Sequence, residues 1–529
     1  MAYSSASETE EVQELGILAA KQGTIYLLGE IGTSLISVVL LIFLTRYLQP
    51  ASFGLFSIAI SFAAILNVAQ NFGIGTAYRK MLPEMRKGGK LKISRLLTSG
   101  YVVALPIATA IAVIGVLISG VISTSIYHDP ALMLALELAA VSELLAVIFN
   151  LLQAVLVGLG RVLEATIANA LYSALYLVGA VVLVLLGYGV VGAVAGMLIG
   201  LIAGAVAGAA YTMKHVGIGI ARPDKKGIES VSAFSAPIMA SNIAAQGALN
   251  LAVLVIGVVA VASVVGNYGA AYKLARLVDL MITAITFILV GTFSSAFSRK
   301  RLASRIGSIY NNSIYYTAIF LFPIVAYGIA CAPPLTRLLF SASYTTAPIF
   351  FSVMIGGMAA GVIGMYAGTL MISSGNTKKF MKYQLIAIAM QIALLLLLAP
   401  FFKAAGALVA LFVITPIVLD IIYIRALKRQ FRVAHSFGPL AKVTLASVIA
   451  GLAMAAVALL MHERLLSLLA NALVLVVLFP PLLAISKGVG RKNLEFIKDT
   501  GRRLRQLHYI TDWLADYTGR FVRADQKAL

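Results

Sequence analysis

Long apolar blocks alternate with short polar segments along almost the whole chain. The blocks are roughly 20 to 28 residues long, the length that an α-helix needs to cross about 30 Å of hydrocarbon. Proline, glycine and charged residues separate them. They predict fourteen transmembrane helices: 24–45, 54–77, 97–122, 131–157, 163–187, 189–213, 232–260, 267–295, 308–332, 347–372, 380–400, 404–424, 440–460 and 465–486. The tight junctions at 187–189 and 400–404 predict hairpins.

The composition supports a membrane protein. Of the 529 residues, 61% are hydrophobic and 12% are charged, and the mean hydropathy is +0.98. A soluble domain is about half apolar and a quarter charged. The single cysteine, Cys331, allows no internal disulfide and is expected to be a packing residue. Residues Met1 to Glu14 are polar and acidic, unlike a signal peptide, so we expect the first helix to remain in the mature protein.

The net charge of +21 is explained by membrane topology. With the N-terminus inside, nearly all Lys and Arg lie in or beside the cytoplasmic segments, and the opposite loops carry little beyond Arg46, Arg337, Lys403 and Arg464. The cytoplasmic segments are 1–23, 78–96, 158–162, 214–231, 296–307, 373–379, 425–439 and the tail from Lys487. This bias predicts a plasma-membrane protein with both termini in the cytoplasm. Bases dispersed in loops argue against a nucleic-acid partner.

The two halves of the chain repeat each other. Three glycine pairs recur at a separation of 214 or 215 residues: Gly54 and Gly269, Gly160 and Gly375, Gly192 and Gly406. Six helices separate equivalent positions, so both repeats enter the membrane in the same sense, related by an axis along its normal. The predicted fold class is an all-α polytopic membrane protein: two pseudo-symmetric six-helix bundles and two C-terminal helices around a central cavity.

This repeat divides the chain into six parts. They are a cytoplasmic N-terminal segment (1–23), an N-terminal six-helix bundle (24–213), a cytoplasmic linker (214–231), a C-terminal six-helix bundle (232–424), two additional transmembrane helices (440–486) and a basic amphipathic cytoplasmic tail (487–529). The tail is expected to lie on the anionic inner leaflet, with partner docking or regulation as alternatives. In the sixth span, a glycine every four residues from Gly192 to Gly208 predicts close helix packing, or else a sliding interface.

Ionisable residues inside the spans are candidates for function, because charge is costly in lipid. Lys273, Arg276 and Asp279 follow one another at i, i+3 and i+6 and therefore share one face of the eighth span. Two interpretations remain open. Arg276 and Asp279 form an internal pair, or the face is the cationic wall of a cavity for an anionic substrate.

Other polar residues deep in the spans favour a wet central cavity. They are Glu30 in the first span, Asn67, Gln70 and Asn71 in the second, Glu137 and Glu143 in the fourth, and Asn242, Gln246 and Asn250 in the seventh. Spans 1, 2, 7 and 8 are equivalents in the duplication, and they hold many of these groups.

The sequence lacks the residue patterns expected for direct use of ATP, for a metal site and for an external catalytic domain. The sequence contains no P-loop motif for direct use of ATP, and its five histidines have no metal-ligand spacing. No outer loop exceeds roughly 15 residues, too few for an external catalytic domain. We therefore expect no enzymatic activity and no cofactor, and coupling to a proton or sodium gradient stays open.

The segment from Leu44 to Ser57 resembles the polysaccharide-biosynthesis flippases (O-antigen and teichuronic acid type exporters) of the multidrug/oligosaccharidyl-lipid/polysaccharide exporter superfamily. Arg46, Pro50 and Phe53-Gly54 match the pattern that follows the first helix of this family. The stretch 71–84, with Arg79 and Pro83-Glu84, is similar to the end of its second helix, and Tyr268-Gly269 with 272–277 is similar to its eighth.

The resemblance implies a flippase for a lipid-linked oligosaccharide, working by alternating access. It implies a cationic cavity for the pyrophosphate and sugar headgroup, with Arg46, Arg79, Lys273 and Arg276 as candidates. Arg46 and Arg79 lie at span ends, where an interfacial anchor is the alternative. The expected partners are a polyprenyl-phosphate-linked glycan, membrane lipids and glycan-assembly enzymes. The main rival is a cation-coupled multidrug exporter of the same superfamily, and a membrane enzyme or scaffold is the second.

Overall fold

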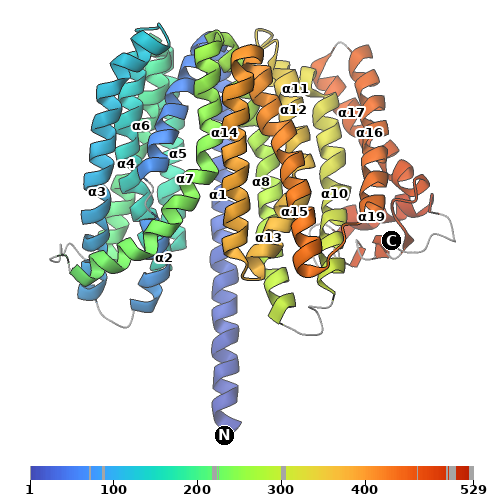
Figure 1. The fold of residues 1–529 in the computed structure, drawn as a ribbon, viewed down its shortest axis with the longest axis horizontal. Coiled ribbons are helices and arrows are strands. Elements are labelled where there is room, and N and C mark those ends of the chain that lie inside the picture. The colour runs from blue at the N-terminus through green and yellow to red at the C-terminus, as the bar shows by residue number, and fades with distance from the viewer. Residues whose placement is uncertain are drawn as a thin grey trace. The chain divides into compact units, whose positions relative to one another are not determined.

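The computed structural model describes residues 2–70, 73–85, 90–216, 223, 225–298, 305–461, 463–491, 493–495, 498–499 and 508–522, and its elements there are all helices (Figure 1). They are α1 (Ala2–Gln70), α2 (Ile74–Met85), α3 (Lys90–Val121), α4 (Leu132–Gly158), α5 (Val162–Leu183), α6 (Gly189–Val216), α7 (Lys225–Val259), α8 (Ala262–Ser298), α10 (Ile306–Ala330), α11 (Ala332–Leu339), α12 (Ala347–Ala360), α13 (Val362–Ser373), α14 (Thr377–Leu408), α15 (Thr415–Phe431), α16 (Phe437–Leu460), α17 (Arg464–Ile485) and α19 (His508–Gly519). Three π-helical segments join or end helices: Ile122–Ile126, Val184–Tyr188 and Val409–Ile414.

Each of the fourteen predicted ranges overlaps described helix, and non-helical residues lie near three predicted boundaries. The φ angles are 59° at Gln49, 93° at Gly187 and 52° at Lys403. Gln49 precedes Pro50, and a residue before proline is disfavoured in the α conformation. Eight helical stretches of the described chain, or nine with a bent pair, are long and apolar enough to span a membrane. Three of the eight are 46 or 55 residues long, so the number of crossings stays a prediction.

Two predicted spans differ from the helices observed. The prediction of one helix over 54–77 is wrong, because α1 ends at Gln70 and a new helix, α2, begins at Ile74. Gly73 between them has a φ of 70°, a conformation that favours glycine. The span 347–372 is divided into α12 and α13, which meet at Gly361 with a bend of 41°.

The chain forms two compact units, Met1–Gly269 and Ala270–Leu529, called unit 1 and unit 2 below. Unit 1 contains α1 to α7 and the first turns of α8. Within it α7 packs against α1, α2 and α3, although the duplication makes α7 the first helix of the second repeat.

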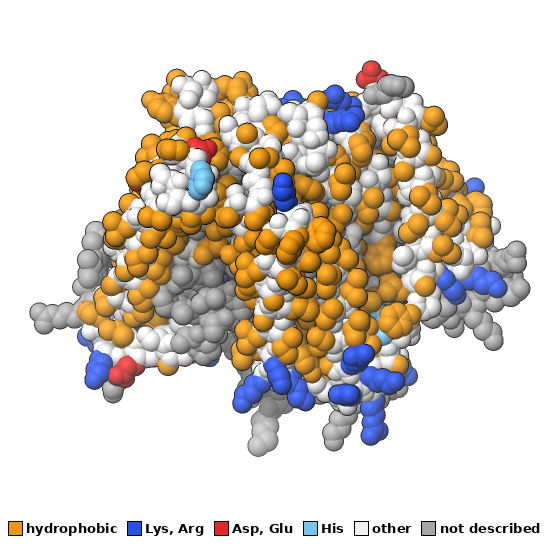
Figure 2. Space-filling model, turned by 45° about the horizontal axis from the view of Figure 1, so that its top comes forward, with side chains coloured by type: hydrophobic (Ala, Val, Ile, Leu, Met, Phe, Trp, Pro, Cys, Tyr) orange, Lys and Arg blue, Asp and Glu red, His pale blue; other side chains and the backbone are white. Residues whose placement is uncertain are grey.

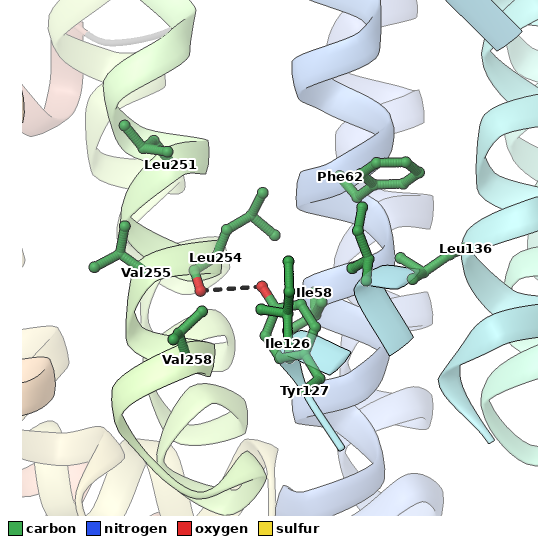
Figure 3. A pocket seen from close by; sticks show the side chains of 10 residues that line it. Ile58, Phe62, Ile126, Tyr127, Leu136, Leu251, Leu254, Val255 and Val258 are labelled. Carbon is green, nitrogen blue, oxygen red and sulfur yellow. Dashed lines mark hydrogen bonds between the residues drawn. The ribbon is translucent and has the colours of Figure 1, made fainter. Parts of the chain in front are cut away.

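A hydrogen bond attaches α7 to the end of α3. The Tyr127 hydroxyl donates to the carbonyl oxygen of Leu254 at 3.0 Å, beside an apolar cavity of about 240 Å³ (Figure 3). Ile58 and Phe62 of α1 and Val255 and Val258 of α7 line this cavity. The first helix of the second repeat is thus held inside unit 1 by both polar and apolar contacts.

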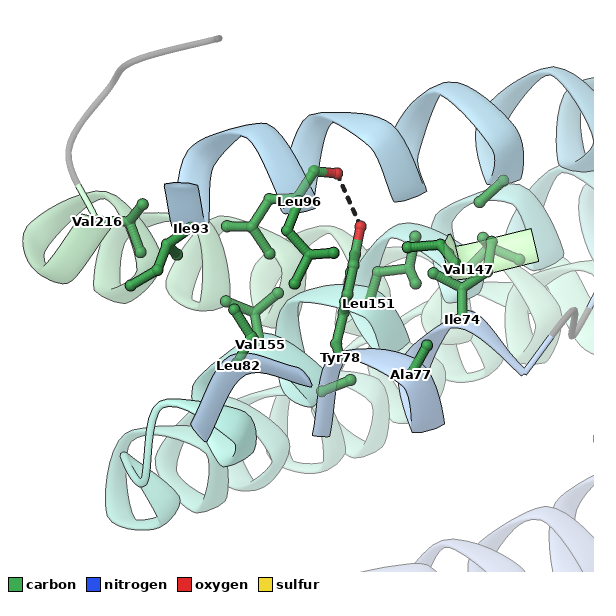
Figure 4. Close-up of a cluster of buried hydrophobic side chains, with 14 of the residues drawn as sticks. Ile74, Ala77, Tyr78, Leu82, Ile93, Leu96, Val147, Leu151, Val155 and Val216 are labelled. Atoms are coloured by element: carbon green, nitrogen blue, oxygen red, sulfur yellow. Dashed lines mark hydrogen bonds between the residues drawn. The ribbon is translucent and has the colours of Figure 1, made fainter. Parts of the chain in front are cut away.

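The short helix α2 is fixed by a buried tyrosine. Tyr78 lies in a cluster of apolar side chains from α2, α3 and α4, and its hydroxyl donates to the Leu97 carbonyl oxygen at 2.7 Å (Figure 4). A Cβ at Gly100 would lie 2.0 Å from that hydroxyl, so glycine is required there. This packing leaves the neighbouring Arg79 exposed.

Two helices equivalent in the duplication cross in backbone contact within unit 1. A Cβ added at Gly54 of α1 would lie 1.9 Å from the carbonyl oxygen of Ala262, and one added at Gly266 of α8 would lie 1.8 Å from that of Pro50. A Cβ added at Gly269 of α8 would lie 2.4 Å from the Ser57 hydroxyl oxygen, so this position is also too crowded for a side chain. Both members of the first glycine pair of the duplication therefore lie at close contacts between α1 and α8.

The glycine stripe of α6 is a packing surface, as predicted. Gly192, Gly196, Gly200, Gly204 and Gly208 are all buried. A Cβ at Gly196 would lie 2.3 Å from the Ala180 nitrogen of α5. Glycine therefore lets α5 and α6 approach within backbone contact.

In unit 2, one apolar cluster joins α10, α16 and α17 to the described part of the C-terminal tail. Ala515 and Val522 are buried in it, and the Tyr517 hydroxyl donates to the Val477 carbonyl oxygen of α17. Trp513 is 53% exposed, so α19 packs on unit 2 and still has an exposed aromatic side chain.

Hydrophobic side chains cover the flanks of the helices, and Lys and Arg lie mainly at their ends (Figure 2). Such flanks suit a hydrocarbon environment.

Candidate functional site

Unit 2 contains the cationic face predicted on α8. Lys273 and Asp279 are partly buried and Arg276 is exposed. The Arg276 guanidinium forms a hydrogen bond with the Tyr272 side chain and interacts electrostatically with Asp279. Among the described residues, Arg276 and Asp279 do not form a direct ion pair. The guanidinium is therefore oriented by a neutral partner, with the Asp279 carboxylate within electrostatic range.

A second polar group lies in unit 1, around Tyr26 of α1. The Tyr26 hydroxyl donates to the Glu30 carboxylate, and Arg79 of α2 is within electrostatic range of Tyr26. Glu30 and Arg79 were each predicted from the sequence as site residues. In the folded chain both interact with Tyr26. Nothing in the sequence pattern indicated this tyrosine.

A buried carboxylate joins α1 to α4. Asn67 Nδ2 donates to Glu143 Oε2 at 2.6 Å, and Glu143 is 8% exposed. No Lys or Arg of the described residues forms an ion pair with Glu143. A carboxylate in an apolar bundle without a cationic partner is costly when ionised, which makes it a candidate for function.

Asp420 of α15 was not among the residues predicted from the sequence. Its Oδ1 accepts the backbone N–H of Gly364 at 2.7 Å, in the first turn of α13 just after the bend at Gly361. The first N–H groups of a helix have no partner in their own helix and carry partial positive charge, so this carboxylate caps α13 from a neighbouring helix. The signal was available, because Asp420 is the one acidic or basic residue within 404–424.

The remaining candidates do not join these groups. Arg46 is exposed near the Gln49 break of α1, which suits the interfacial alternative, and Asn250 is partly buried in α7. Asn71 and the side chains of Asn242 and Gln246 lie outside the described residues. Glu30, Arg79 and Asn250 belong to unit 1, whereas Lys273, Arg276 and Asp279 belong to unit 2. The described residues contain no group of three or more His, Cys, Asp or Glu suited to a metal ion.

Comparison with known proteins gives both a family and a fold. Residues 43–348 match the family described as polysaccharide biosynthesis protein. No curated protein sequence matches the chain significantly.

Several solved structures are similar. Lipid II flippase MurJ in an inward closed conformation has a TM-score of 0.71 at 14% identity, covering 86% of this chain and 98% of its own. An inward-facing multidrug resistance MATE family transporter of the MOP superfamily has a TM-score of 0.64 at 17% identity, covering 76% and 94%. A MOP superfamily transporter from Pyrococcus furiosus, described with a binding pocket of reverse polarity, has a TM-score of 0.52 at 16% identity, covering 78% and 95%. At these identities the likeness establishes the fold.

Proposed function

The chain belongs to the polysaccharide biosynthesis protein family, and from that premise we propose that it moves a polyprenyl-phosphate-linked oligosaccharide from the cytoplasmic to the outer leaflet. It is a multi-pass membrane protein with the fold of MOP superfamily transporters. In the proposed cycle the substrate-binding groups are exposed alternately to the two sides of the cell membrane. Both termini lie in the cytoplasm, where glycan-assembly enzymes deliver the substrate.

The observation that supports this substrate class is the cationic face of α8. Lys273 and Arg276 lie one turn apart, and Tyr272 orients the guanidinium. A guanidinium presents paired N–H donors that match phosphate oxygens, and a lysine adds a flexible point charge. In the proposed site these two side chains bind the phosphates.

The test is movement of a fluorescent polyprenyl-diphosphate glycan across the membrane of reconstituted vesicles. Lys273→Ala and Arg276→Ala are expected to lower the initial rate by roughly 10- to 100-fold, since a hydrogen bond to a charged group contributes about 1.5–3 kcal/mol. Lys403→Gly is the control: it removes an exposed cation elsewhere, and glycine suits its φ of 52°. Wild-type rates in both alanine variants would reject this site, and no movement by the wild type would reject the substrate.

The rival function is a cation-coupled multidrug exporter, and one buried group bears on ion coupling in both functions. Glu143 is a buried carboxylate whose described hydrogen-bond partner is the neutral Asn67. Such a group suits the uptake of a proton or sodium ion, so we propose Glu143 as the coupling residue in either function. Glu143→Gln should remove the acceleration that an imposed ion gradient produces and leave the slower movement without a gradient. Gradient-driven efflux of organic cations, without movement of the glycan lipid, would assign the chain to the exporters.

A further inference from the structure

Unit 2 contains a large groove that the proposed transport site does not use. Its volume is about 860 Å³, within the range of about 300–1,000 Å³ typical of ligand pockets. Its walls come from α10 and α11 on one side and from α16 and the start of α17 on the other. The described residues that line it include neither Lys273 nor Arg276, so the groove is distinct from the cationic face of α8.

The walls of the groove are apolar and follow α16 for several turns. The α16 wall carries small side chains at Gly451, Ala455 and Ala458. The α16 side of the groove runs from Val448 to Met461, a distance of about 20 Å at 1.5 Å per residue. One leaflet contributes about 15 Å of hydrocarbon, so the groove has the depth of one leaflet and its headgroup region.

Two arginines lie at one end of this groove. Arg337 is in the last turn of α11 and Arg464 is the first residue of α17, and both are exposed. Arg464 Nη1 donates to the carbonyl oxygen of Arg337 at 3.3 Å, which brings the second guanidinium to the end of α11. Within the described chain, no Asp or Glu forms an ion pair with either arginine, including the adjacent Glu463.

Topology does not explain the position of these arginines, although Arg337 in the last turn of α11 suits the dipole of that helix. They are two of the four cations that stand out in the predicted outer loops, where Lys and Arg are otherwise avoided. A cation at the N-terminus of a helix also opposes the helix dipole, so Arg464 is unfavourable for α17 itself. Two such cations at the mouth of one apolar groove complement a ligand with an anionic head and an apolar chain.

We propose that this groove binds an anionic phospholipid of the outer leaflet, with its phosphate on Arg337 and Arg464 and an acyl chain along α16. The length of the groove along α16 favours this occupant. An acyl chain is as long as one leaflet is thick, whereas a polyprenyl chain is longer than the groove. The bound lipid bridges α11 to α17 and thereby stabilises unit 2. The site does not depend on the proposed transport function.

The test uses the full chain purified in a neutral detergent, with dioleoyl phosphatidylglycerol and dioleoyl phosphatidylcholine as matched probes. Lipid binding is measured by native mass spectrometry, and the midpoint of thermal unfolding is measured with each lipid. Phosphatidylglycerol should bind more tightly and raise the midpoint more. The double variant Arg337→Gln/Arg464→Gln should lower its affinity by roughly 25-fold, since each basic residue contributes about 1 kcal/mol near an anionic lipid surface. Lys403→Gly, which removes another predicted outer cation, should match the wild type.

A second variant separates binding from folding. Ala458→Trp places a large side chain in the groove and leaves both arginines intact, so it should abolish the preference for phosphatidylglycerol even if the double variant fails to fold. Equal effects of the two lipids on the wild type, or an unchanged preference in Ala458→Trp, would overturn the proposal. Displacement of phosphatidylglycerol by equimolar long-chain polyprenyl phosphate would also overturn it, and would assign the groove to the glycan carrier.

Discussion

The crossing of α1 and α8 in unit 1 gives a direct test of how closely these helices pack. The perturbation is Gly266→Ala, one methyl group at a backbone contact. Its Cβ would lie 1.8 Å from the Pro50 carbonyl oxygen, about 1.6 Å short of the 3.4 Å at which ordinary contact begins. The obstacle is backbone, which no rotamer change removes, so the helices themselves must separate.

The expected loss of stability follows from two opposing terms. Overpacking costs typically 1–3 kcal/mol, and a backbone obstacle places this contact near the upper end. Replacing glycine by alanine inside a helix recovers up to about 1 kcal/mol. The net effect of Gly266→Ala is therefore a decrease of about 2 kcal/mol in the free energy of unfolding.

The assay is unfolding by a denaturing detergent in mixed micelles, with Gly120→Ala as the matched control. Gly120 also lies in a helix of unit 1, but its added Cβ would meet only the flexible end of Met133 at 3.7 Å. This control should equal the wild type or exceed its stability by up to about 1 kcal/mol. Because Gly54→Ala acts on the same crossing, the double variant with Gly266→Ala should lose less than the sum of the two single losses. Wild-type stability in Gly266→Ala would refute the backbone contact.

Three further predictions use the same unfolding assay. Asp420→Ala should lower stability by about 2 kcal/mol, because the N–H of Gly364 loses a charged acceptor, whereas Asp420→Asn keeps an acceptor oxygen and should lose less. Tyr78→Phe should lose about 1 kcal/mol with its buried hydrogen bond, and a loss below the error of the assay would contradict that geometry. Burial lowers the pKa of His435, in the segment between α15 and α16, below its ordinary 6.5. The unfolded state therefore takes up this proton first, so stability should decrease as the pH falls below 6.5, and His435→Gln should remove that dependence.

The sequence was sufficient for the class of protein and for most helix positions. Crossing a bilayer imposes a length and an apolarity on each helix, and these constraints are local enough to be read from consecutive residues. The packing role of the α6 glycines was equally accessible, because a spacing of four residues places them on one helix face. The break before Pro50 also has a local cause in the restricted conformation of the preceding residue.

The tertiary structure decided which polar groups meet. The pairing of Asn67 with Glu143, separated by 76 positions, depends on how α1 packs on α4. The capping of α13 by Asp420 depends on a bend at Gly361 that the apolar run 347–372 conceals, because both halves are equally hydrophobic. The placement of α7 in unit 1 likewise cannot be read from the order of the repeats along the chain and follows from contacts such as Tyr127 with Leu254. Hydrophobicity places each helix in the membrane, whereas side-chain packing and single hydrogen bonds determine its neighbours.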